Sequence, residues 1–243
     1  MTYIFPKYVN VPGIQSTPIH YTWDDWNVED ADLPLDDAVQ TQLSHISHRA
    51  IMAFTIATSE WIVYRFDSLM RDPMPTQRLE AAWAQICHFQ YSYHEDISRD
   101  VWNGPVRGPV RVAMRRVVFA IQQSQSSDDP AWRAGRASKL AEHVIADPKP
   151  YQDWRESILS RFEKLYPLDP DVALGEVIPR EALDPSVDFY PSATETLINQ
   201  FLSQLDHQEN PFLNSPKRMI ELGFKGTPYT FDIERERRDR LDW

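Results

Sequence analysis

The first half of the chain contains histidine and carboxylate side chains, which are types that ligate metal ions. His45 and His48 are three residues apart, and His88 and Glu95 are seven apart, so each pair would share one helix face. His94 directly precedes Glu95. Helical bundles build metal-dependent hydrolase sites from such ligands on facing helices. Because the chain has no Glu-x-x-His or His-Glu-x-x-His motif, we favour solvated or capping histidines and expect no bound cofactor.

Three arginines at a spacing of four residues could bind an anion. These are Arg107, Arg111 and Arg115. A Gly-Pro dipeptide precedes each of the first two, and the three side chains would lie one above another on a helix. The N–H groups and dipole of a helix start attract anions, and guanidinium groups add bidentate contacts to phosphate or carboxylate. We favour the alternative, in which this basic face forms ordinary ion pairs with the protein's own acidic segments.

Carboxylates and tryptophans are interleaved near the beginning of the chain. Between residues 21 and 37 there are seven carboxylates and two tryptophans, with no lysine or arginine. Tryptophan anchors and negative charge suit a cationic protein surface. The candidate partner-binding residues are Trp23, Asp24, Asp25, Trp26, Glu29 and Asp30. The alternative is an arm that its tryptophans pack onto the body of the protein, with its carboxylates in water.

Two further residues could carry chemistry but are better explained by packing. Cys87, the single cysteine, lies in an aromatic-rich stretch and is interpreted as a small buried hydrophobic residue. Glu60 lies within an apolar stretch, where a carboxylate must be paired or neutralised. We expect a structural ion pair between Glu60 and Arg65, or between Glu60 and an arginine of the 109–125 helix.

Apolar residues that recur every three or four positions predict the elements that position these side chains. The predicted helices span residues 36–70, 76–102, 109–125, 130–146, 150–165 and 193–205, with a short one at 216–222. The fold class is therefore all-α, an irregular bundle of about six helices with Pro-rich, largely non-helical arms at both ends. We expect one domain over residues 1–243, with an arm at 1–34, a main bundle at 35–166, a Pro-rich connector at 167–190 and a C-terminal helix and packed tail at 191–243.

Composition narrows the function classes. The 243 residues carry a formal net charge of −11, which disfavours general nucleic-acid binding and favours a basic partner. One cysteine excludes an internal disulfide framework, and no apolar run approaches the roughly 20 residues of a membrane span. We expect a cytoplasmic protein without catalysis, such as an inhibitor, immunity protein or adaptor that engages a basic protein. The alternative is a helical metal-assisted hydrolase that uses the histidine and glutamate residues above.

Overall fold

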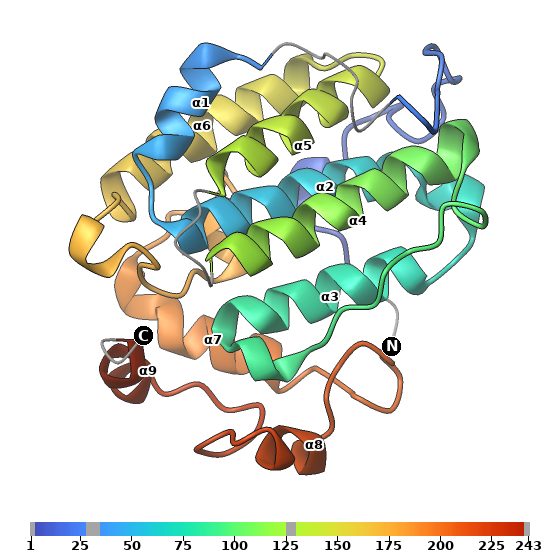
Figure 1. Cartoon of the computed structure of the whole chain (residues 1–243). Coiled ribbons are helices and arrows are strands. Elements are labelled where there is room, and N and C mark those ends of the chain that lie inside the picture. The colour runs from blue at the N-terminus through green and yellow to red at the C-terminus, as the bar shows by residue number, and fades with distance from the viewer. Residues whose placement is uncertain (1–2, 28–34, 125–129, 241–243) are drawn as a thin grey trace.

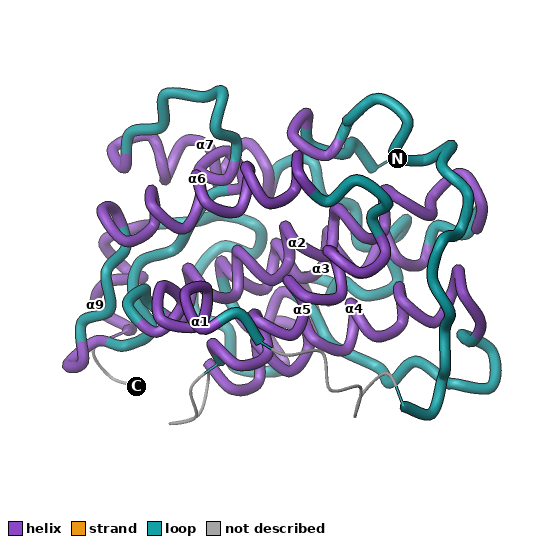
Figure 2. The backbone as a smooth tube through the Cα atoms, turned by 90° about the horizontal axis from the view of Figure 1, so that it is seen from above, coloured by secondary structure: helices purple, strands orange, loops and turns teal. Residues whose placement is uncertain are grey.

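The computed structural model of the chain describes residues 3–27, 35–124 and 130–240. In these residues it contains nine α-helices, five short 3-10 helices and no β-strand, and 60% of them are helical (Figures 1 and 2). The predicted all-α class is therefore confirmed. Within the same residues, no helix has both the length and the apolar character that crossing a membrane requires.

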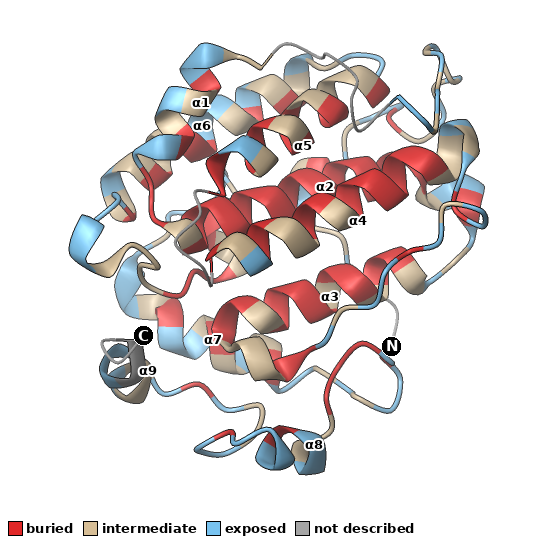
Figure 3. Cartoon of the chain, viewed as in Figure 1, coloured by how far each residue is buried: buried red, intermediate tan, exposed pale blue. Residues whose placement is uncertain are grey.

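Helix α2 (His48–Met70) lies at the centre of the structure and is buried on every side along most of its length (Figure 3). Every residue from Arg49 to Val63 is buried. Three helices pack directly against it: α3 (Met74–Cys87), α4 (Gly104–Ser124) and α5 (Ala131–Val144). A helix covered on all sides must be apolar on all sides, which is the pattern of this stretch of sequence.

The helix predicted over residues 36–70 is two helices, α1 (Asp37–Ser44) and α2, so this prediction was wrong at residues 45–47. Ser47 is extended and caps α2, because its Oγ accepts a hydrogen bond from the N–H of Ala50. The residues between the helices pair with a distant segment: Ser47 N donates to Tyr166 O at 2.9 Å, and Leu168 N donates to His45 O at 2.8 Å. Backbone pairing with residues 166–168 therefore interrupts a pattern that locally favours one helix.

The helix predicted over residues 76–102 was also too long, because α3 ends at Cys87. Beyond it the chain forms a 3-10 turn over Phe89–Tyr91 and then runs extended. Tyr93 N donates to Phe212 O at 3.2 Å, and Asn214 N donates to Tyr91 O at 2.9 Å. Contacts with a segment more than a hundred residues away again replace local helix formation.

The remaining helices complete the body. Helix α6 (Lys149–Leu165), α7 (Thr194–Leu202) and α8 (Pro216–Glu221) lie close to their predicted bounds, whereas α9 (Ile233–Arg240) was not predicted. Figure 1 shows α1, α5 and α6 on one side of α2, and α3 with α7, α8 and α9 on the other. The last third of the chain therefore covers the α3 side of the central helix.

Glu60 is fully buried in α2, and its ion-pair partner is Arg180 rather than Arg65. Arg180 Nη2 lies 2.7 Å from Glu60 Oε1, and the Trp83 indole N–H donates to the same oxygen at 2.9 Å. The hydroxyls of Tyr3 and Tyr8 also donate to this carboxylate. Residues five apart on a helix point roughly 140° apart, so Arg65 cannot reach Glu60.

Candidate functional site

The arm places its candidate partner-binding residues in two different roles. Asp24 Oδ1 accepts from the N–H of Trp26 at 2.8 Å, so this carboxylate closes a local turn. Trp26 is 75% exposed, and the guanidinium carbon of Arg99 lies 4.9 Å from its ring centroid. Glu29 and Asp30 lie outside the described residues. Of the described residues in this set, Asp24 and Trp26 are exposed, and Trp26 is the one that offers a large aromatic surface to solvent.

Asp25 and Tyr21 complete the first turn of α4. Gly104 begins the helix with a φ of 76°, which glycine adopts without strain, and its N–H donates to Asp25 Oδ2 at 2.9 Å. Pro109 lies inside α4 and has no N–H for the carbonyl of Pro105, four residues earlier. The Tyr21 hydroxyl donates to that carbonyl instead. A carboxylate of the chain itself therefore lies at the helix start where the sequence suggested an anion.

Residues 104–107 and 108–111 repeat the sequence Gly-Pro-Val-Arg, and Trp23 explains the glycine of the second copy. The indole Nε1 of Trp23 donates to Asp25 Oδ1 at 2.7 Å, so both oxygens of that carboxylate are used. A Cβ at Gly108 would lie 2.1 Å from the same indole nitrogen, which is closer than any side chain allows. The two glycines of the repeat thus have different functions: the first starts the helix, and the second makes room for the arm.

The three arginines of the candidate anion site do not form one exposed face. Arg107 is 40% exposed, with its guanidinium carbon 5.1 Å from the ring centroid of Trp102 and Nη2 3.9 Å from Asp72 Oδ2. Arg111 is only 1% exposed, and its Nε donates to Trp102 O at 3.0 Å. Arg115 packs on Phe119. The positive stripe is interrupted because α4 turns Arg111 into the body of the protein.

The candidate metal ligands are dispersed, because the two helices that were to align them are shorter than predicted. His45 and His48 lie on either side of the break before α2, and His88 ends α3, so helical spacing no longer relates it to Glu95. Glu95 is exposed, whereas burial and the charge of Arg78 lower the pKa of His94 to about 4. No group of three or more His, Cys, Asp and Glu side chains in the described ranges could hold a metal ion.

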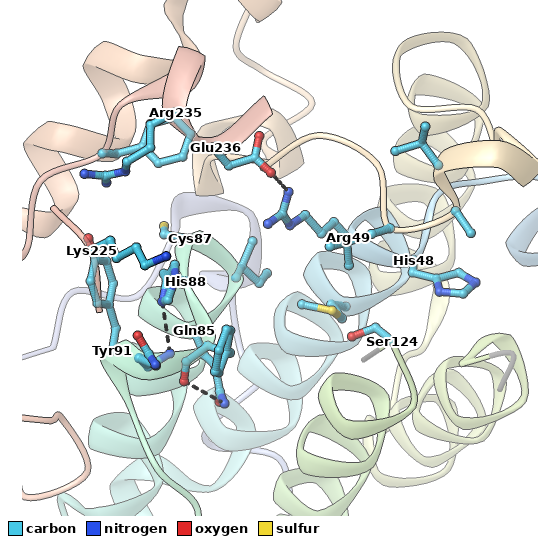
Figure 4. Close-up of a pocket in the computed structure, with 18 of the residues that line it drawn as sticks. His48, Arg49, Gln85, Cys87, His88, Tyr91, Ser124, Lys225, Arg235 and Glu236 are labelled. Carbon is cyan, nitrogen blue, oxygen red and sulfur yellow. Dashed lines mark hydrogen bonds and ion pairs between the residues drawn. The ribbon is translucent and has the colours of Figure 1, made fainter. Parts of the chain in front are cut away.

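Two of these histidines border a cavity of about 830 Å³, which lies between the first turn of α2, the end of α3, Ser124 at the end of α4, the 168–174 loop and residues 223–236 (Figure 4). His48 and His88 lie on opposite sides of it. Its charged lining residues are Arg49, Asp171, Lys225, Arg235 and Glu236. The five bordering segments come from separate parts of the sequence and meet only in the folded chain.

Ion pairing leaves a cationic edge on this cavity. Arg49 pairs with Glu236, and both side chains are about nine-tenths buried. Arg235 packs on Phe224 and donates from Nη2 to Thr230 O at 3.3 Å. Lys225 is exposed and extends beside His88 (Figure 4). With Arg49 and Glu236 neutralising each other, Lys225 and Arg235 outweigh the single remaining carboxylate, that of Asp171.

Aromatic rings form an apolar surface in the same cavity. The ring of His88 stacks on Phe89 with centroids 4.8 Å apart and meets the ring of Phe224 edge-on. His88 Nδ1 accepts from the N–H of Gln90 at 3.2 Å, so the neutral imidazole carries its hydrogen on Nε2. Tyr91 and Phe231 add two further rings to the lining. The cavity can therefore receive a ligand that has both a flat apolar part and an anionic group.

The nucleophile types in the cavity are not activated. Burial raises the pKa of the Cys87 thiol to about 12, so the thiol remains protonated at neutral pH. The Ser124 hydroxyl donates to Ile121 O at 2.7 Å, within its own helix. Sequence reasoning placed Cys87 correctly as a buried residue but missed Lys225, Arg235 and Glu236. The signal available for the latter two was the dense mixture of charges near the end of the chain.

Comparisons of this chain with protein-family models, with curated proteins and with solved structures find no match.

Proposed function

We propose that the protein is a non-catalytic binding protein whose cavity holds a small anionic molecule with an aromatic or apolar part. One observation carries this proposal: a cavity of about 830 Å³ lined by the cations Lys225 and Arg235 together with aromatic rings. This volume lies in the range of small-molecule sites, which combine an apolar lining with a few placed polar groups.

The charge distribution supports an anionic ligand. The chain as a whole carries a net charge of −11, so a cationic edge is a local exception. An anion that diffuses near the protein is repelled by most of its surface and gains favourable energy only where cations are concentrated. Burial of the ligand's rings against His88, Phe89 and Phe231 adds the apolar contribution.

A pair of fluorescent dyes separates the two contributions. Anilinonaphthalene sulfonate carries an anionic group, and phenylnaphthylamine has the same rings without it. We expect the Lys225→Gln and Arg235→Gln double variant to bind the sulfonate about tenfold more weakly, since the loss of two partly exposed ion pairs amounts to about 1.4 kcal/mol. Binding of the uncharged dye should be unchanged.

Two further variants control this experiment. Lys217→Gln removes an exposed charge from α8, outside the cavity, and should leave sulfonate binding unchanged. Ala173→Phe places a ring in the loop that lines the cavity and should weaken binding of both dyes. Equal sulfonate affinity in the parent, the double variant and Ala173→Phe would contradict a cavity-bound anion.

A second candidate function is the binding of a basic protein by the arm, as an inhibitor, an immunity protein or an adaptor would do. The specific observation is that Trp26 is 75% exposed and already stacks on the guanidinium of Arg99. An incoming arginine could take the same position on this ring. We expect a fluorescent hexaarginine peptide to bind in low salt and Trp26→Ala to weaken it several-fold. Tyr190→Ala, another exposed aromatic residue, is the matched control, and equal losses in both variants would exclude this function for the arm.

A further inference from the structure

Three arginines converge on one tryptophan between α4 and α5. The guanidinium carbons of Arg116, Arg133 and Arg136 lie 5.7, 4.5 and 5.0 Å from the ring centroid of Trp132. We call these four residues the arginine–tryptophan cluster. Trp132 is 40% exposed, so the cluster reaches the surface. Its members are outside the cavity lining, and its function is therefore independent of the function proposed above.

The cluster concentrates positive charge in a partly buried place. Arg116 is only 6% exposed, and burial together with the charges of Arg133, Arg136 and Arg115 lowers its pKa to about 10. Arg133 Nε is buried without a hydrogen-bond partner. No carboxylate of the residues that the structure describes forms an ion pair with Arg116 or Arg133. Burying cations costs free energy unless an anion or hydrogen-bond acceptors compensate them.

We propose that the arginine–tryptophan cluster binds a phosphate monoester group. Arginine forms bidentate hydrogen bonds with phosphate oxygens, and a dianion neutralises two of the crowded cations at once. The stacking of the Arg133 guanidinium on Trp132 holds this group in place, and its buried Nε is without a hydrogen-bond partner in the part of the chain that the structure describes. A compact phosphate fits better than a polyanion, because the net charge of −11 repels a long nucleic acid.

Calorimetric titration with phenyl phosphate tests this site. Arg133→Gln removes the most centrally placed guanidinium, and we expect at least a tenfold loss of affinity. Arg133→Lys keeps the charge but loses the bidentate geometry, and its affinity should lie between those of the parent and Arg133→Gln. Arg218→Gln, an exposed arginine on α8, should bind phenyl phosphate like the parent. Equal affinity in the parent and Arg133→Gln overturns the proposal.

Two further measurements identify the ligand group. The second phosphate ionisation has a pKa of about 6, so phenyl phosphate should bind more tightly at pH 7.5 than at pH 5.5, while sulfate affinity stays constant. Phenyl phosphate should also raise the melting temperature of the parent but not of Arg133→Gln. Because Arg116→Gln removes a buried group and can fail to fold, these measurements use Arg133, which is only partly buried.

A third measurement identifies the source of the phosphate group. A phosphotyrosine peptide that binds more tightly than phenyl phosphate places the group on a protein, and equal affinities indicate a free phosphate ester; both results support the site. Tighter binding of a short DNA duplex than of phenyl phosphate would show a polyanion surface and overturn the assignment. No heat of binding and no change in melting temperature at millimolar phenyl phosphate would overturn it as well.

Discussion

The carboxylate of Asp25 accepts a hydrogen bond from the N–H of Gly104, the first residue of α4, although 79 positions separate them in sequence. A helix start is usually capped by the residue just before it. Here the cap comes from the arm, and Trp23 fixes its second oxygen. The positive end of the α4 dipole is thus met by an internal carboxylate, and each oxygen of Asp25 already accepts a hydrogen bond from within the chain.

Replacing this cap should destabilise the protein. We expect Asp25→Ala to lower the free energy of unfolding by about 1 to 2 kcal/mol, the usual cost of losing a helix cap. Urea denaturation monitored by circular dichroism measures the change. Asp188→Ala removes an exposed carboxylate far along the chain and should have no measurable effect. Equal stability of the two variants would show that the Asp25–Gly104 hydrogen bond contributes nothing.

Tyr21 and Pro109 should be energetically coupled. Tyr21→Phe removes the hydroxyl that donates to Pro105 O, and we expect a loss of about 1 kcal/mol. Pro109→Ala restores an N–H four residues after Pro105, so the carbonyl gains an intrahelical donor. In that background Tyr21→Phe should cost little. A double-mutant cycle by urea denaturation checks this, and strictly additive changes would contradict the proposed substitution of donors.

The buried pair of Glu60 and Arg180 should be far more sensitive than an exposed pair. Glu60→Gln leaves the Arg180 cation without its counterion, and we expect a loss of about 3 kcal/mol. Glu221→Gln breaks the exposed pair with Arg218 and should cost at most about 0.5 kcal/mol. Thermal and urea denaturation at pH 7 measure both variants. Adding Arg180→Gln to Glu60→Gln should recover part of the loss.

His94 should make the protein less stable in mild acid. Its pKa is lowered from 6.5 to about 4, so below pH 6.5 the unfolded chain binds a proton that the folded chain does not. Above pH 6.5 this histidine is neutral in both states and costs no stability. As the pH falls toward 4, the free energy of unfolding decreases by up to about 3 kcal/mol. His94→Gln should lose stability less steeply than the parent between these values. His45→Gln, in which the original side chain is 63% exposed, should follow the parent curve.

Local pattern was sufficient to predict most of the helical body. Helices α2, α5 and α6 bury continuous apolar faces, and periodicity finds such faces. The break at Ser47 and the end of α3 at Cys87 depend on backbone pairing with residues 166–168 and 212–214, which no local window contains. Helix α9 has little apolar character and is held by charge, through Arg49–Glu236 and through Arg237–Glu176 at 3.1 Å.

The candidate sites were harder to predict for a related reason. The arginine spacing on α4 was clear, but spacing alone does not show that Arg111 faces inward. Glu60 was identified as a buried carboxylate, yet its partner Arg180 lies in a Pro-rich stretch 120 positions further on. The cavity needs five separate segments to come together, so single residues such as Lys225 carry no recognisable motif.

The docking of the arm on α4 also has a kinetic consequence. Contacts that close a long loop carry a large entropic cost before they return any stabilisation, and the Tyr21–Pro105 and Asp25–Gly104 contacts each close a loop of about 80 residues. Helix α4 can grow from its own sequence beyond Pro109, whereas its first turn has to wait for the arm. We therefore expect the arm to dock on α4 after the transition state of folding. Weakening its contacts should accelerate unfolding while leaving the folding rate almost unchanged.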